Sequence, residues 1–304
     1  MVKGGTGMRN KIREARSDRL FNLVNAVILT VFFLTVLYPI VYIVSASFSS
    51  ANAVVSGRVF LWPVEFGLQG YKAVFDSKLI WTGFGNSLFY TAVGTTLSVL
   101  LTIAAAYPLS RKDFVGRNAF MLIFIFTVMF SGGMIPTYMV VKDLGILHTR
   151  WAMIFPAAMS VFNVIITRTY FQANVPHEML EAARMDGCND LTFLRRIVIP
   201  LSGPIVAVIT LFYAVHNWNS YFDALLYLNK QQMFPLQLIL RGILIQNQVD
   251  PSMIVNEEDM LARQSLADLL KYSLIIVASI PILLIYPFIQ KYFVKGVMIG
   301  SIKG

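Results

Sequence analysis

Long stretches without a charged side chain dominate the chain. Read from charge to charge, six runs composed mainly of Leu, Ile, Val, Phe and Ala lie between Arg19 and Lys291. A transmembrane helix needs about 20 apolar residues in a row, whereas a barrel strand spans about 10 and alternates in polarity. The runs therefore predict an all-α, polytopic membrane protein. We expect six transmembrane helices, at 22–46, 85–110, 119–141, 151–171, 204–222 and 273–293.

Composition supports this prediction. Hydrophobic residues make up 57% of the 304 residues and charged residues 13%, against about 25% charged in ordinary soluble domains. Such a chain is too apolar to be disordered and has too few charges to cover a soluble surface. The single cysteine, Cys188, excludes a disulfide framework and a Cys-rich metal site.

The basic residues predict the orientation. The formal net charge is +9. With six spans, the two chain ends and the loops at 110–118 and 172–203 lie on one side, and this side carries the whole surplus of nine. Because loops rich in Lys and Arg stay on the cytoplasmic side of a membrane, we expect both termini to be cytoplasmic. The surplus then reflects orientation beside anionic lipid rather than binding of nucleic acid.

The predicted organisation is a single membrane domain with short tails. We assign 1–20 to an N-terminal cytoplasmic tail, 21–293 to the membrane domain and 294–304 to a C-terminal cytoplasmic tail. The long external loop 223–271 contains an apolar segment at 236–240 that is too short to span the bilayer. It also contains a polar stretch at 252–270 that we predict to be helical.

The sequence offers little chemistry for catalysis or ion coupling. No Asp, Glu, Lys or Arg lies within the six charge-free runs, although ion-coupled transporters place such groups in the membrane. The three histidines are scattered, and no Lys follows a Gly, as a phosphate-binding loop would require. We expect no catalytic site, metal or cofactor in this chain. For His216, an interhelical hydrogen bond is favoured over a proton relay.

Several polar side chains within or beside the spans need partners in a hydrocarbon setting. They could form interhelical hydrogen bonds, or they could line a polar path through the membrane, and the sequence leaves both readings open. The stretch 130–136, which contains two glycines and a proline, is expected to break the third helix. The candidates for a translocation path are Ser131, Asn163, Asn217, Asn219 and Tyr221.

The most distinctive segment is the loop between the fourth and fifth spans. Pro176 and Glu178 suit the start of a short helix, and Gly187 suits its end. A second helix is expected to start at Asn189 and Asp190 and to run towards Pro200. We therefore predict a helix–turn–helix that presents Ala182, Ala183 and Gly187 outward, where small residues would let a partner approach closely.

This loop resembles the EAA loop of ABC-importer permeases. The family pattern is EAA-x3-G-x9-I-x-L-P, and the chain has Glu181-Ala182-Ala183, Gly187, Ile197 and Ile199-Pro200 at these spacings, with Ile199 in the place of Leu. Trp218-Asn219 and the closing residues 295–304 are similar to carbohydrate-importer permeases of the maltose-transporter type. The stretch 130–136 resembles the branch of this family that handles oligosaccharides.

The resemblance implies a mechanism and partners. The chain would be one of two different, homologous permease subunits forming a heterodimer in a bacterial cell membrane. It would be joined by two ATPase subunits that hold ATP and Mg, and by an extracytoplasmic sugar-binding protein. The expected ATPase-coupling residues are Glu181, Ala182, Ala183, Asp186, Gly187 and Pro200. ATP binding would draw the coupling helices together and rock the spans between inward-open and outward-open states. The chain itself would not be an enzyme.

Two other classes compete with this interpretation. A six-helix channel or facilitator that needs no ATP would explain the spans but not the EAA pattern. A membrane scaffold or intramembrane enzyme is disfavoured because the sequence lacks a recognisable catalytic set.

Overall fold

The computed structural model describes residues 16–246, 269–287 and 290. Within these residues the secondary structure consists of helices and the segments that connect them. Four expected features lie outside the described residues, wholly or in large part. They are the N-terminal tail up to residue 15, the polar helix at 252–268, the end of the sixth span after residue 290, and the C-terminal tail at 294–304.

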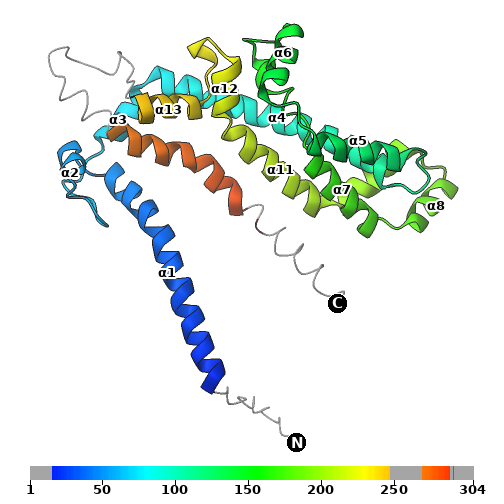
Figure 1. Cartoon of the computed structure of the whole chain (residues 1–304), viewed down its shortest axis with the longest axis horizontal. Coiled ribbons are helices and arrows are strands. Elements are labelled where there is room, and N and C mark those ends of the chain that lie inside the picture. Colours follow the sequence, from blue (N-terminus) through cyan, green and yellow to red (C-terminus); the bar gives the residue numbers. More distant parts are fainter. Residues whose placement is uncertain (1–15, 247–268, 288–289, 291–304) are drawn as a thin grey trace, which may run out of the picture.

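The central element is α4 (Lys78–Ser110), a helix of 33 residues that runs along the long axis of the molecule (Figure 1). Helices α7 (Val161–Asn174) and α11 (Gly203–Trp218) pack along it. The packed faces contain polar side chains as well as apolar ones. The hydroxyls of Thr102 and Tyr213 lie 2.7 Å apart, and the Asn217 amide donates to Thr95 Oγ1 at 3.3 Å. These hydrogen bonds fix the register of α11 on α4.

Three described helices are long and apolar enough to cross a membrane: α1 (Arg16–Ser47), α4, and the helix Leu269–Pro287. Two bent helix pairs would raise this number to five, if each pair forms one span. The described part of the chain thus bears out a multi-pass helical membrane protein, and the count of six spans stays a prediction. The second span begins at Lys78, earlier than expected, because Ser77 caps the helix by accepting from Ile80 N.

The third predicted span is broken. Helix α5 (Arg117–Met129) and helix α6 (Met134–Asp143) meet at an angle of 113°. Gly133, at the break, has φ 85° and ψ −176°, a conformation that is essentially restricted to glycine. The expectation that 130–136 breaks the third helix is therefore confirmed.

The fourth predicted span, 151–171, is also wrong in its first half. Residues Arg150–Met153 form a 3-10 turn, an irregular segment follows, and α7 begins at Val161. Pro156 lies in the irregular segment, and a proline disfavours helical geometry in the residue before it. The described α7 has 14 residues, which is short for a membrane span.

The chain turns sharply before α11. The segment Asp190–Leu201 meets α11 at 84°. It comprises α9 (Asp190–Phe193), a π-helical turn (Leu194–Val198) and α10 (Ile199–Leu201). Pro200 has no N–H for the carbonyl four residues before it, and the N–H of Ile199 bonds to Leu194 O in the wider π spacing. The return helix ends at Leu201, one residue beyond the proline expected to end it.

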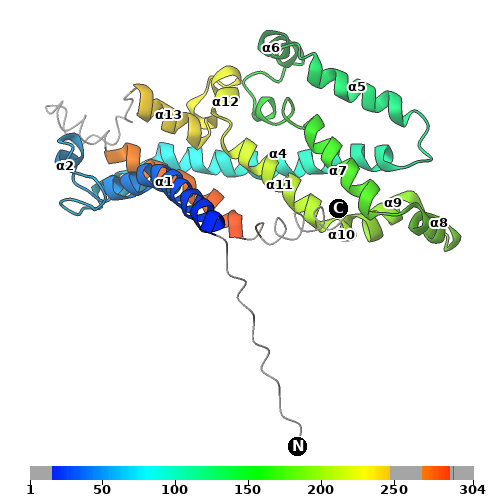
Figure 2. The ribbon, with the colours of Figure 1, turned by 60° about the horizontal axis from the view of Figure 1, so that its bottom comes forward.

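Helix α1 stands away from the other helices and meets them near its C-terminal end (Figure 1); in Figure 2 it lies in front of them. There the hydroxyls of Ser47 and Tyr71 lie 2.9 Å apart, and the rings of Tyr42 and Tyr272 meet edge to face. The most apolar 18-residue window of α1 is not buried within this chain. Its apolar surface is therefore available to lipid or to another subunit.

Shorter helices gather at the end of α4 that is opposite α8 (His177–Met185) (Figure 1). Helix α13 packs on α4, and the backbone N–H of Leu236 donates to Ser87 Oγ at 2.9 Å. The expected short apolar segment at 236–240 thus forms part of an 11-residue helix. The elements of this end are α2 (Ala51–Val55), α3 (Gln69–Asp76), α12 (Tyr221–Tyr227), a 3-10 turn (Gln231–Met233) and α13 (Leu236–Gln246).

Candidate functional site

Helix α8 (His177–Met185) lies at one end of the molecule, in the loop that carries the EAA pattern. Pro176 occupies the N-cap, and Glu178 lies in the first turn, where the helix dipole favours an acid. Leu180 and Ala183 are buried in the core cluster that also contains Phe171 and Phe193. This apolar face packs α8 into a cluster with residues of α4, α7 and α9. A nine-residue helix needs such packing, because helices this short are not stable in isolation.

The opposite face of α8 is exposed. The side chain of Glu181 is 67% exposed and Met185 is 89% exposed. Ala182 is also exposed, but Ala183 is buried and points towards the core. The expectation that Ala183 faces outward is therefore wrong, because residues three apart on a helix share a face and Ala183 follows Leu180 inward. Sequence reasoning did not single out Met185, although a large apolar residue flanked by polar positions was a usable signal.

Gly187 ends α8, as the sequence predicted. Its φ is 75°, and Cys188 N donates to Ala183 O while Gly187 N donates to Arg184 O. These two bonds are the Schellman arrangement, which needs the left-handed residue that glycine supplies without strain. Asn189 then caps α9 by accepting from Thr192 N at 2.8 Å. The predicted helix–turn–helix is thus present, and Asp186 lies exposed at the C-cap of α8.

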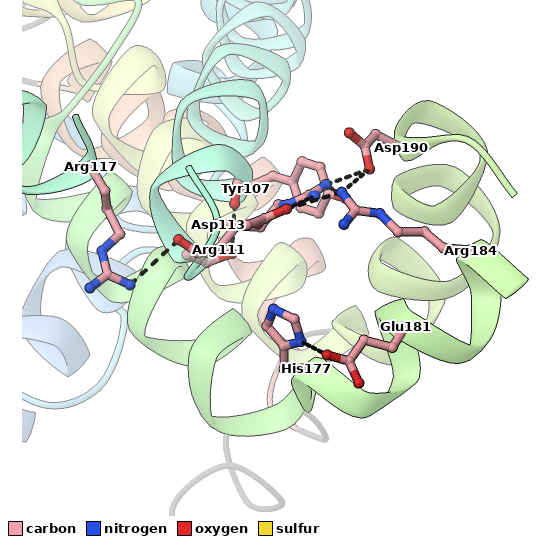
Figure 3. A network of polar contacts seen from close by, with 9 residues as sticks. Tyr107, Arg111, Asp113, Arg117, His177, Glu181, Arg184 and Asp190 are labelled. Carbon is pink, nitrogen blue, oxygen red and sulfur yellow. Dashed lines mark hydrogen bonds and ion pairs between the residues drawn. The ribbon is translucent and has the colours of Figure 1, made fainter. Parts of the chain in front are cut away.

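Two polar networks include side chains of α8 (Figure 3). His177 Nδ1 lies 3.1 Å from the carboxylate of Glu181, one turn along the same helix. The second network joins Arg111, at the C-cap of α4, to Asp113, Arg184 and Asp190. Hydrogen bonds from the Arg111 guanidinium hold the pKa of the Asp113 carboxyl well below its usual range, and Asp113 raises that of Arg111 in return. Both groups therefore stay charged at physiological pH.

A cavity of about 560 Å³ lies between α7 and α11, with walls from α6, α12 and the irregular segment before α7. Its polar lining includes Asn163, His216 and Asp223. Burial raises the pKa of the Asp223 carboxyl, and the nearby His216 opposes this shift. Of the five residues proposed for a translocation path, the cavity includes Asn163.

The other four path candidates lie elsewhere. Asn217 is buried and donates to Thr95 between α11 and α4, whereas the Asn219 amide donates to Val215 O in its own helix. Tyr221 is half-exposed at the start of α12, and Ser131 accepts from Gly133 N in the break between α5 and α6. His216, for which the sequence favoured an interhelical hydrogen bond, lines the cavity. Asp223 was missed as a cavity residue because helix periodicity does not reveal which helices face each other.

In residues 16–246 and 269–287, no group of three or more His, Cys, Asp or Glu side chains is placed to hold a metal ion. The polar groups at α8 and in the cavity are suited to docking and hydrogen bonding.

Residues 4–299 match the family described as the binding-protein-dependent transport system inner membrane component. The chain belongs to this family. It is therefore a permease, the multi-pass membrane component of a transport system.

The permease has well-matched relatives along its whole length. It is 43% identical over 288 residues to the polygalacturonan/rhamnogalacturonan transport system permease protein YtcP of Bacillus subtilis (strain 168), covering 94% of this chain and 99% of the relative. It is 29% identical over 272 residues to the arabinooligosaccharides transport system permease protein AraQ of Halalkalibacterium halodurans, covering 88% and 91%.

A solved structure resembles the permease closely. It comes from a bacterial ABC transporter involved in the import of the acidic polysaccharide alginate. The TM-score is 0.86 at 40% identity, and the match covers 92% of this chain and 99% of that one. The fold described above is therefore that of an importer permease.

Proposed function

We propose that the permease is one of two non-identical membrane subunits of an ATP-driven importer, and that its substrates are acidic oligosaccharides. Family membership supports the importer assignment. The substrate class rests on the relatives, since one is named for polygalacturonan and rhamnogalacturonan and another transports alginate. An extracytoplasmic binding protein would deliver the sugar, and two separate ATPase subunits would hold ATP and Mg. The permease would not be an enzyme.

The observation that carries the coupling role is the exposed face of α8. An exposed Met185 beside an exposed Glu181 combines an apolar contact with a charge, on a helix fixed by a buried face. Large exposed apolar side chains on a polar surface mark protein interfaces. We assign this face to docking on an ATPase subunit. Ala182, Asp186 and Gly187 would lie at the contact, and Ala183 and Pro200 would shape the loop that supports it.

The cavity between α7 and α11 supplies a candidate path. Asn163, His216 and Asp223 provide hydrogen-bonding groups of the kind that sugar hydroxyls need. In the complete importer, movement of α8 would change the packing of the membrane helices and open the path alternately to either side. The six spans and the cytoplasmic placement of both termini and α8 belong to this proposal, supported by the basic surplus.

Reconstitution tests this function. The permease, its partner permease and the ATPase are placed in proteoliposomes, and the binding protein is added with labelled oligosaccharides of uronic acids or of neutral sugars. We expect ATP-dependent uptake that prefers the acidic oligosaccharides. Uptake without ATP would instead favour a channel or facilitator, and a preference for neutral sugars would overturn the substrate class.

Glu181→Lys tests the role of α8 in the same system. We expect the variant to lose the ATPase subunits on purification in mild detergent and to lose uptake. Asp143→Lys is the matched control, since it makes the same charge change at an exposed acid on α6. If Glu181→Lys and Gly187→Pro both leave uptake unchanged, coupling through α8 is wrong.

A further inference from the structure

The second polar network beside α8 is a closed ring of alternating charges. Arg111 contacts Asp113 at 2.6 Å and Asp190 at 2.5 Å. Arg184 contacts the same two carboxylates, at 3.0 Å from Asp113 and 3.7 Å from Asp190. Each acid therefore touches both bases, and the four charges cancel. We call these four residues the charge ring.

The charge ring joins segments that are distant in sequence. Arg111 caps α4, Asp113 lies in the turn after it, Arg184 lies in the last turn of α8, and Asp190 begins α9. The residues lie next to one another in Figure 3, between the end of α4 and the two helices of the loop. The C-terminal end of α8 is thus tied to the end of the longest described helix.

The centre of the ring is better shielded than an ordinary surface ion pair. The Arg111 side chain is 11% exposed, donates to the Tyr107 hydroxyl at 3.0 Å and lies over the Tyr107 ring at 5.6 Å. The Asp113 carboxylate accepts hydrogen bonds from Nε and Nη2 of Arg111 and a third hydrogen bond from Nη2 of Arg184. Exposed single ion pairs contribute little to stability, whereas bidentate arginine–carboxylate pairs are stronger and geometrically specific. The Arg111–Asp113 pair therefore anchors the ring, and the more exposed Arg184 and Asp190 join it at 47% and 58% exposure.

We propose that the charge ring transmits the movement of α8 to α4, so that its four members are positioning residues for the coupling of ATP hydrolysis to transport. The proposal rests on the function proposed above and adds the mechanical connection inside this chain. Helix α8 is joined to its neighbours along the chain by short turns at 175–176 and 186–189. A force on α8 would bend these turns unless a second attachment carried it. The buried face packs α8 into a cluster with residues of α4, α7 and α9, and the ring adds a directional, charged attachment to the end of α4.

A structural role without transmission predicts a different result. In that case, removing one ring member would lower the thermal stability of the complex but leave unchanged the number of sugars imported per ATP hydrolysed. Transmission requires this coupling ratio to fall while the ATPase subunits stay bound. The coupling ratio is therefore the decisive measurement.

Arg184→Ala opens the ring, yet it leaves Asp113 and Asp190 paired with Arg111. In proteoliposomes with the partner permease, ATPase and binding protein, we expect normal assembly and a coupling ratio reduced about fivefold or more. Arg195→Ala is the matched control, since Arg195 is an exposed arginine of the same loop with no ion pair in the part of the chain that is described. An unchanged ratio in Arg184→Ala overturns the proposal.

A covalent replacement provides a second test. In a Cys188→Ser background, Asp113→Cys and Arg184→Cys remove three of the four ring contacts, leave Arg111 paired with Asp190, and supply two thiols. A disulfide needs Cα atoms within about 7 Å, so a short, reducible bifunctional thiol reagent is used to span the longer Asp–Arg distance. We expect a low coupling ratio before cross-linking, recovery after it, and loss again on reduction. A ratio that stays low after complete cross-linking overturns the proposal.

The two proposals fail in different ways. If Glu181→Lys abolishes ATPase binding while the ring variants keep a normal coupling ratio, the docking role of α8 stands and the charge ring is not its link to α4. If Glu181→Lys has no effect, the proposed function fails first.

Discussion

The side chain of Asn217 lies directly over Gly94 at the crossing of α11 and α4. A Cβ atom on Gly94 would lie 2.9 Å from Asn217 Nδ2 and 3.1 Å from Cγ. Asn217 is held there by its hydrogen bond to Thr95, the residue beside Gly94. The missing side chain of Gly94 thus makes room for the polar contact between the two helices, as small residues do in membrane helix packing.

Gly94→Val is expected to separate α4 from α11. Overpacking of this kind costs about 1–3 kcal/mol, so the thermal midpoint of the detergent-solubilised protein should fall. Gly85→Val is the control, because a Cβ on Gly85 would meet nothing within 4 Å. Adding Asn217→Ala to Gly94→Val should recover part of the loss. A double variant as unstable as Gly94→Val would show that Asn217 is not the obstacle.

The cavity and the helix crossing should respond differently to alanine. Asn163→Ala is expected to lower sugar transport while the binding protein still stimulates ATP hydrolysis, because the Asn163 side chain lines the cavity. Asn217→Ala should leave transport nearly unchanged and cost only about 0.6 kcal/mol of stability, the typical value of an interhelical hydrogen bond in a membrane. The measurement is sugar uptake by the two variants. If Asn217→Ala lowers uptake more than Asn163→Ala does, the path lies at the α4–α11 crossing and not in the cavity.

Gly187→Ala tests the turn that orients α8. A left-handed conformation costs a residue with a Cβ about 1–2 kcal/mol, and Gly187 has φ 75°. We expect the end of α8 to fray and the yield of complex with the ATPase subunits to fall. Gly187→Asn should be milder, since Asn adopts this conformation more readily. Equal yields for both variants and the parent would show that the complex does not depend on this turn.

Met185→Asp tests the exposed face of α8. The charge should weaken ATPase binding, because an apolar contact surface is replaced by a carboxylate that must be desolvated. Val115→Asp is a matched control. Val115 lies between α4 and α5 and is 91% exposed, while Met185 is 89% exposed. Copurification of the ATPase with both variants would contradict the assignment of this face.

Local signals accounted for much of the loop. The ends of α8 and the start of α9 depend on the backbone conformation or the capping side chain of single residues, namely Pro176, Gly187 and Asn189. Their positions in the sequence therefore predicted these boundaries. The break at Gly133 was predictable for the same reason. The bend of 113° and the irregular segment that replaces the first half of the fourth span were not, because run length alone does not distinguish a membrane helix from apolar chain packed in another form.

The sequence by itself determined an all-helical, multi-pass membrane protein and a helix–turn–helix in the loop at 172–203, because apolar run length and backbone chemistry are local properties. Only the tertiary structure decided which side chains meet. It placed Ala183 inward, gave Asn217 a partner on α4, and brought Arg111 to Asp190, which is 79 residues away in the chain. Such contacts depend on which helix faces are pressed together, and helix periodicity carries no information about the partner.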